Sequence, residues 1–457
     1  MSTAAQLKER WQHGSKQYSA RVNPQWVRLL NLLEMNVRYE RCAGVELFTS
    51  DGRRILDFLS GYCVHNVGHN HPHVIQALQE ELRRSGPAMI QTHVADLAGE
   101  LADRLCSLAG GRLSRAFFAS SGSEGVEAAI KFARAHTRRG GILAAEHAFH
   151  GLTCGALSLM SDDFWRAGFG PLLPEAKTVP FASLEALECE LKTKKFAAFI
   201  VEPIQSEAGV RVPGADYLRE AQELCRRFGT LFVLDEVQTG MYRTGSFLAA
   251  HRFGVEPDMV ILAKALSGGL VPVAAVLMSE EVCDSVYSSL PRAFVHTSTF
   301  SENSLAMRAG IATLEVLERE SLGQRSVRAG EYLTSELRNA LGEFEMVREI
   351  RGLGLLMGIE FQAPRQLRLR VPYEAFGAIH AGMFGQIVVM RLFRDFAFLT
   401  QVCGNNFMVL KVAPPLVVDE QQMDAFVKAV HSVAELANSP GIFWSEALGL
   451  ARRAFRG

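Results

Sequence analysis

The sequence predicts an α/β protein whose central sheet is mostly parallel. From about residue 72 to 300, short apolar runs alternate with helical patterns, which is typical of a parallel sheet covered by helices. Two of these runs end in Asp235 and Lys264, and their separation of about 30 residues is the span of one crossover between parallel strands. Both side chains are therefore expected at the sheet edge where such folds bind ligands. The expected strands are 144–145, 197–201, 231–234, 259–262 and 271–277.

The segments on either side of this pattern predict a second, smaller α+β unit. An amphipathic helix is expected over Gln25–Met35, followed by two strands around an Asp51–Gly52 turn. Two long helical patterns come after residue 303. The expected organisation is an N-terminal part of the small domain (1–71), a large α/β domain (72–302), interdomain helices with the C-terminal small domain (303–441), and a basic amphipathic tail (442–457).

Composition excludes several classes of function. Hydrophobic residues make up 48% and charged residues 21% of the chain, and a formal net charge of −1 gives no reason to expect a nucleic-acid partner. The eight cysteines contain no Cys-x-x-Cys pair, which argues for reduced thiols and against a zinc site. No apolar run is long enough for a transmembrane segment, and the N-terminus lacks a signal-peptide core. We expect a cytoplasmic protein without a bound metal.

Lys264 and Asp235 together suggest a cofactor. A lysine that closes a strand is more often only solvated, but burial lowers its pKa and leaves the neutral amine that attacks an aldehyde. An aspartate on the neighbouring strand suits a protonated pyridine nitrogen. Pyridoxal 5'-phosphate (PLP) requires both partners, so the pair predicts a PLP site.

Two further segments are candidates for the same site. Ser120 to Lys131 passes from small hydroxyl residues into a helical pattern, where backbone N–H groups form an anion site, although Ser-x-x-Glu is equally typical of a helix cap. Phe149 could stack on a cofactor ring, or it could be an ordinary core residue followed by a loop histidine, His150.

With these motifs in this order, the chain resembles the class III (ω-type) aminotransferases from roughly residue 24 to 436. These PLP enzymes of fold type I include ornithine, acetylornithine, putrescine and 4-aminobutyrate aminotransferases. The resemblance implies a large PLP-binding domain and a smaller α+β domain formed by the N- and C-terminal segments. The matching segments are Asp57–Pro72, Ser120–Glu124, Phe149–Gly151, Val201–Val210, Leu234–Gly240, Lys264–Gly269, His296–Phe300 and Arg351–Leu355.

The resemblance also implies a role for each site residue. Lys264 would bind PLP as a Schiff base and then serve as general base and acid, while Asp235 would keep the ring nitrogen protonated. Gln238 would contact the ring hydroxyl, and Thr299 would reach the phosphate from the second subunit of a homodimer or of a dimer of dimers. The phosphate would otherwise be held by Ser121, Gly122 and Ser123. The ring and the substrate would be surrounded by Phe149, His150, Tyr62, Glu202, Glu207 and Lys411.

One departure from the family pattern bears on the substrate. The common Arg-x-x-Pro-Pro motif is Lys411-Val-Ala-Pro-Pro in this chain. Arginine binds a substrate carboxylate through a bidentate fork that lysine cannot reproduce. Lys411 is expected to form a single ion pair, with Glu207 as the candidate partner, and Arg391 and Arg394 are candidates to replace the arginine. A change without functional effect is an equally good interpretation.

The sequence therefore predicts an aminotransferase that moves a primary amino group between an amine or amino acid and an oxo acid or aldehyde. An ω-amino group, on ornithine or on a diamine such as putrescine, is the first candidate donor, with glutamate/2-oxoglutarate as the co-substrate. The basic amphipathic tail is more typical of a helix packed on its own domain. A larger apolar or lipid-like aldehyde, for example of a hopanoid side chain, is the second candidate, since Trp444 and Phe455 in the tail would suit such a partner. Further alternatives are a PLP-dependent aminomutase, racemase or decarboxylase, and a PLP-binding regulator without activity.

Overall fold

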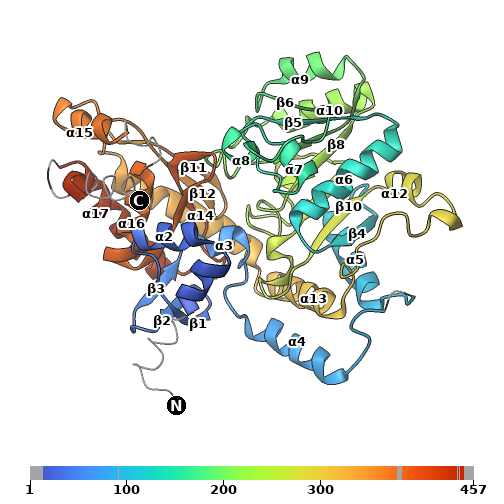
Figure 1. The fold of residues 1–457 in the computed structure, drawn as a ribbon, viewed down its shortest axis with the longest axis horizontal. Coiled ribbons are helices and arrows are strands. Elements are labelled where there is room, and N and C mark those ends of the chain that lie inside the picture. Colours follow the sequence, from blue (N-terminus) through green and yellow to red (C-terminus); the bar gives the residue numbers. More distant parts are fainter. Residues whose placement is uncertain (1–13, 91, 378–382, 440, 442, 447–457) are drawn as a thin grey trace.

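The computed structural model describes residues 14–90, 92–377, 383–439, 441 and 443–446. Figure 1 shows two bodies: a large one around the central sheet, and a smaller one in which the N-terminal strands lie beside C-terminal helices and strands. No helix in the described part of the chain combines the length and the apolar character that a membrane span requires.

The central sheet has seven strands in the order β4-β10-β9-β8-β7-β5-β6. β10 is antiparallel to both of its neighbours, whereas the other neighbouring pairs are parallel, which confirms the predicted fold class. The strands are β4 (Arg115–Ala119), β5 (Gly141–Ala145), β6 (Ala176–Val179), β7 (Phe196–Val201), β8 (Leu231–Asp235), β9 (Met259–Leu262) and β10 (Ala274–Met278).

Helices bury both faces of this sheet. Side chains alternate along a strand, so Val233 and Ile261 pack with the apolar residues of α6 (Gly122–Thr137), while Phe232 and Val260 pack in the core cluster that contains α10. Burial on both faces explains why these strands are continuous apolar runs in the sequence. The other helices of this body are α4 (Pro72–Arg84), α5 (Asp96–Ala109), α7 (Cys154–Ser158), α8 (Asp163–Arg166), α9 (Leu184–Leu191), α10 (Tyr217–Phe228), α11 (Ala249–Phe253), η1 (Lys264–Ser267), α12 (Glu280–Val286), η2 (Leu290–Arg292) and α13 (Ser304–Arg319).

The smaller body combines the two ends of the chain. β13 (Phe398–Leu399) pairs in parallel with β3 (Arg54–Asp57) and so completes an N-terminal sheet with β2 (Glu46–Thr49) and β1 (Tyr39–Ala43). The second sheet, in the order β11-β12-β15-β14, is antiparallel. Its strands and the remaining helices are β11 (Val347–Leu353), β12 (Leu356–Phe361), β14 (Gln401–Cys403), β15 (Asn406–Val412), α2 (Pro24–Leu32), α3 (Ser60–Cys63), α14 (Leu322–Leu341), α15 (Leu367–Gly377), α16 (Met383–Phe396) and α17 (Glu420–Ala437).

Phe443 and Trp444, which belong to the predicted tail, pack on their own domain. Trp444 is 4% exposed, and its indole N–H donates to the carbonyl of Ala437 at 3.1 Å. Its ring lies 6.1 Å from that of Phe384 and 5.2 Å from that of Phe443. Trp444 is therefore a core residue with no face left for a lipid. Phe455 and the rest of the predicted tail lie outside the described residues.

Gly330 marks a close approach between α14 and the turn that joins β11 to β12. A Cβ atom at Gly330 would lie 2.2 Å from the carbonyl oxygen of Gly354, a backbone atom that cannot rotate away. We expect Gly330→Ala to lower the free energy of unfolding by roughly 1–3 kcal/mol, measured by urea titration. The matched control is Gly99→Ala in α5, where nothing lies within 4 Å, and it should stabilise by up to about 1 kcal/mol. Equal effects of the two substitutions would contradict the packing argument.

Candidate active site

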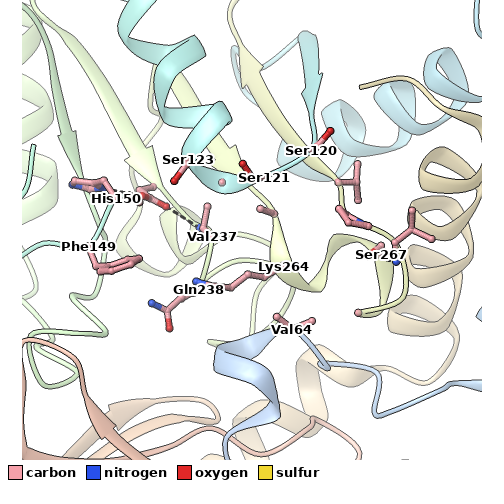
Figure 2. A pocket seen from close by; sticks show the side chains of 18 of the residues that line it. Val64, Ser120, Ser121, Ser123, Phe149, His150, Val237, Gln238, Lys264 and Ser267 are labelled. Atoms are coloured by element: carbon pink, nitrogen blue, oxygen red, sulfur yellow. Dashed lines mark hydrogen bonds and ion pairs between the residues drawn. The ribbon is translucent and has the colours of Figure 1, made fainter. Parts of the chain in front are cut away.

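Lys264 and Asp235 border one cavity of about 510 Å³ beyond the carboxyl ends of β8 and β9. The two strands are parallel, with Asp235 opposite Ile261, so both chains leave the sheet at the same edge. Lys264 has a φ of 46° and begins η1, and Figure 2 shows its side chain extending toward Gln238. The cavity is lined by Val64, Ser120–Ser123, Phe149–Gly151, Glu202, Asp235, Val237, Gln238, Ala263, Lys264, Ser267 and Gly269–Val273.

The surroundings of Lys264 favour its neutral form. Burial lowers the pKa of the Lys264 ammonium below its ordinary value, and the opposing charge of Glu207 does not restore it. A larger share of Lys264 is therefore a free amine at neutral pH, which is the form that reacts with a carbonyl or accepts a proton.

Asp235 is buried and is held by two hydrogen bonds. His150 Nδ1 donates to Asp235 Oδ2 at 2.8 Å, and the backbone N–H of Val237 donates to Oδ1 at 3.1 Å. Burial alone would lower the pKa of His150, but the hydrogen bond and charge of Asp235, together with the charge of Glu202, raise it above its ordinary value. His150 and the N–H of Val237 therefore fix the orientation of the Asp235 carboxylate toward the cavity.

The first turn of α6 is both a capped helix end and an anion site. Ser121 Oγ accepts the N–H of Glu124 at 3.3 Å, and the Glu124 carboxylate accepts the N–H of Ser120 at 2.7 Å. Gly122 and Ser123, the first two residues of α6, line the cavity. The N–H groups in the first turn of a helix have no acceptor within the helix. The two interpretations of this motif are therefore compatible, and the helix end offers free donors to a phosphate.

The segment Phe149–Gly151 closes against this helix end. A Cβ atom at Gly151 would lie 1.9 Å from Ser123 Oγ, so a glycine is required for the approach. Ser123 Oγ accepts the N–H of Leu152 at 3.0 Å, and the N–H of Phe149 donates to Glu202 at 3.0 Å. Figure 2 shows Phe149 beside His150 on one side of the cavity, with Ser121 and Ser123 on the helix end above.

Lys411, Glu207 and Gln238 form a buried network next to the cavity. Lys411 Nζ donates to Glu207 Oε1 and, at 3.3 Å, to the Gln238 side-chain oxygen, while Gln238 Nε2 donates to Glu207 at 3.1 Å. Burial opposes the charges, but the pair raises the pKa of Lys411 and lowers that of Glu207. Tyr62 covers this pair, with its ring centre 5.3 Å from Lys411 Nζ. The expected single ion pair is thus present, and Gln238 is bonded to it while lining the cavity.

Neither candidate replacement for the missing arginine reaches the cavity. Arg391 donates to Asp395 at 2.9 Å and forms an ion pair with Glu446. Arg394 contacts the same two carboxylates. Both arginines lie on α16 among acidic partners, so the hypothesis that one of them binds a substrate carboxylate is wrong for this structure.

Thr299 is the one predicted site residue that the fold leaves far from the lysine. It is exposed, and its neighbours Thr297, Ser298 and Ser301 line a second cavity of about 540 Å³. The sequence interpretation missed Val64 and the segment Gly269–Val273, which line the first cavity. The Ser-Gly-Gly that follows Lys264 was a signal for a tight turn back toward it, because two glycines with positive φ form that turn.

These residues match the chemical demands of PLP. A lysine with a lowered pKa, a carboxylate held by a histidine, free N–H donors at a helix end and an aromatic ring all border one cavity. The sheet order and the site at its carboxyl edge define a PLP-dependent enzyme of fold type I.

The chain belongs to the class III aminotransferases: the family described as "Aminotransferase class-III" matches residues 31–434. It is 35% identical over 449 residues to the aminotransferase PigE of Serratia sp. (strain ATCC 39006), covering 92% of this chain and 53% of that protein. The chain therefore spans about half the length of this curated relative.

Solved structures agree in fold. The ornithine aminotransferase of Toxoplasma gondii, crystallised with partial PLP occupancy, has a TM-score of 0.79 at 30% identity over 88% of this chain and 92% of its own. A PLP-bound amine transaminase from an uncultivated Pseudomonas species has a TM-score of 0.78 at 25% identity, over 88% and 95% of the two chains. Class III aminotransferases use PLP, so the cofactor predicted from Lys264 and Asp235 is confirmed.

Glu202 should make stability depend on pH. Burial, with a smaller contribution from Asp235 opposed by His150, raises the pKa of Glu202 from 4.5 to about 7. The folded state then holds this proton more tightly than the unfolded state, so stability falls as pH rises from 4.5 to 7. We expect Glu202→Gln to remove this loss. As the pH rises from 4.5 to 7, the free energy of unfolding of the variant should therefore increase relative to that of the wild type by up to about 3 kcal/mol.

Urea unfolding of both proteins near pH 4.5 and above pH 7 measures this difference. Any cost of the substitution that is independent of pH cancels in the comparison. Parallel stability profiles for the two proteins would show that Glu202 ionises normally in the folded state.

Proposed function

We propose that this protein is a PLP-dependent transaminase that transfers a primary amino group between an amine or amino acid and an oxo acid or aldehyde. The observation that carries the proposal is the placement of Lys264 and Asp235 on adjacent parallel strands, facing one cavity whose far side is the open end of α6. The relatives named above are aminotransferases and transaminases, which favours this function over that of an aminomutase, a racemase, a decarboxylase or an inactive regulator.

The roles of the side chains follow from their surroundings. Bound PLP supplies an aldehyde and an electron-withdrawing ring. We propose that Lys264, whose pKa is lowered by burial, holds the cofactor and then moves the proton at the donor carbon. Asp235, fixed by His150, would hold the protonated ring nitrogen, and Gln238 would face the ring hydroxyl. Phe149 would cover a ring face, and the phosphate ligands would be Ser121, Gly122 and Ser123.

We further infer that the donor amine is terminal. Among the described residues that line the cavity there is no arginine to fix an α-carboxylate, and the charge of Lys411 is already neutralised by Glu207. Ornithine and amine transaminases among the relatives support the same donor class. Glutamate/2-oxoglutarate is proposed as the co-substrate pair. To bind Lys411, a carboxylate of either molecule would have to compete with Glu207.

An absorption titration of the purified holoenzyme tests this function. Glutamate, ornithine, putrescine and a long-chain amine are added one at a time, and the donor is expected to bleach the visible cofactor band while the near-ultraviolet band of the amino form grows. Lys264→Ala should lower the rate of this conversion by at least about a hundredfold, because the proton carrier is lost. The control Lys428→Ala changes a surface lysine on α17 and should leave the rate unaltered. Conversion at the wild-type rate by Lys264→Ala would refute the assignment.

We propose that the protein acts as a cytoplasmic homodimer or dimer of dimers. All eight cysteines are free, which supports a reducing compartment. Large apolar side chains are exposed around the second cavity, where Thr299 lies, and a second copy of the chain would cover them. They are Ile90, Val94, Leu290, Phe294 and Phe300.

Phe294→Asp should weaken this dimer, because a carboxylate would be buried without a partner in the apolar interface. Sedimentation is expected to show the wild type at twice the mass of one chain and the variant shifted toward the monomer, with weaker PLP retention since Thr299 of the second subunit is lost. Leu367→Asp, at an equally exposed position on α15, is the control and should remain dimeric. A monomeric wild type would contradict the proposal.

A further inference from the structure

Four aromatic rings lead from the cavity to the protein surface. Phe149, which lines the cavity, packs edge-on against Trp165, with ring centres 5.3 Å apart at 76°. Trp165 packs against Phe164 at 4.8 Å and 84°, and Phe164 against Phe407 of β15 at 6.2 Å and 86°. We call these four residues the aromatic ladder. Its outer member, Phe164, is 71% exposed.

Hydrogen bonds fix the central ring of the ladder. The indole N–H of Trp165 donates to Asn405 Oδ1 at 2.6 Å, and Asn405 Nδ2 donates to the carbonyl of His147 at 2.7 Å. Asn405 thereby ties the β14–β15 turn to the segment that carries Phe149. With its only polar atom bonded to the protein, Trp165 has an apolar face left to offer a ligand.

The inner end of the ladder lies next to the Lys411–Glu207 pair. A Cβ atom on Gly404 would lie 3.3 Å from the Trp165 ring and 3.1 Å from Glu207 Oε2, so this one glycine separates the ring from the carboxylate. The N–H of Gly404 donates to Glu207 at 2.8 Å. The cation that could attract a substrate carboxylate is thus already paired, while the path outward from Phe149 is aromatic. Leu152, which follows Gly151, is also exposed.

We propose that the aromatic ladder binds the apolar tail of the substrate, so that the preferred donor or acceptor is a primary amine or aldehyde on a hydrocarbon chain. The inference rests on the transaminase function and specifies its substrate class. Trp165 and Phe164 would be its specificity-determining residues: they do not line the cavity around Lys264 and Asp235, but they continue the aromatic surface from Phe149 outward. The path along the ring centres from Phe149 through Trp165 to Phe164 is about 10 Å. At about 1.3 Å per methylene, a chain of about eight methylenes is needed to span it.

A series of unbranched amines from butylamine to decylamine tests the proposal on the holoenzyme. For the wild type, kcat/KM is expected to rise about fourfold for each added methylene until the ladder is filled, because each buried methylene is removed from water. In Trp165→Ala and in Phe164→Asp, the factor by which kcat/KM rises with each added methylene should fall from about four toward one. Phe164→Asp is expected to disturb the fold less than Trp165→Ala, since the Phe164 side chain is 71% exposed. Leu367→Ala, which truncates a 74% exposed side chain on α15, is the matched control and should keep the wild-type increment.

A binding measurement separates this proposal from the proposed function. Dissociation constants of the same amines on borohydride-treated holoenzyme, which cannot turn over, should show the same increment by calorimetry. If long amines bind more tightly but no amine bleaches the cofactor band, the ladder is supported and the transaminase function fails. If butylamine and decylamine react and bind equally well, the ladder is overturned and the transaminase function stands. An increment that survives in both ladder variants also overturns it.

Discussion

The parallel pairing of β8 with β9 is the constraint on which the active site depends. Both strands are buried on two faces, so a shift of one residue in register would turn every side chain to the opposite face of the sheet. The register is therefore fixed, and with it the edge at which Asp235 and Lys264 leave the sheet. The same burial that fixes the strands removes water from Lys264 and lowers its pKa. Fold stability and the reactivity of the amine thus have a common origin in the buried sheet.

Buried charges around the cavity are each compensated in a different way. Asp235 is paired with His150, and Glu207 with Lys411, so each of these buried carboxylates has a partner of opposite charge or a hydrogen-bond donor. Glu202 has only the backbone N–H groups of Phe149 and Ser206 as direct partners, and its pKa rises to about 7 instead. Asp235 and Glu207 thus each have a side-chain partner, whereas Glu202 lines the cavity with a pKa raised to about 7.

The sequence predicted those features that depend on local pattern. The limits of β9 and α10, and the meeting of Asp235 with Lys264, follow from apolar periodicity and the length of a crossover. Contacts between distant segments could not be predicted: β13 completes the N-terminal sheet from a position more than 300 residues away, and Trp165 finds its partner Asn405 in the other body. The sequence left two interpretations of the tail open, packing on its own domain or contact with a lipid, because the burial of Trp444 depends on Phe384, which no local pattern reveals. The proposed role of Thr299 depends on a contact with a second chain, which no local pattern within one chain describes.

The β14–β15 turn contacts both regions of the protein that are proposed to bind the two ends of the substrate. Its residue Gly404 donates to Glu207, the partner of Lys411, while its residue Asn405 holds Trp165 in the aromatic ladder. Glu207 and Trp165 belong to the large body and the turn to the small one, so these contacts also hold the bodies together at the cavity. A ligand that displaces Glu207 from Lys411 would disturb the hydrogen bond between the Gly404 N–H and Glu207. A ligand that lies on Trp165 would stabilise the hydrogen bond between Trp165 and Asn405. The two proposed determinants of the substrate, the Lys411–Glu207 pair and the aromatic ladder, are thus connected through adjacent residues of one turn.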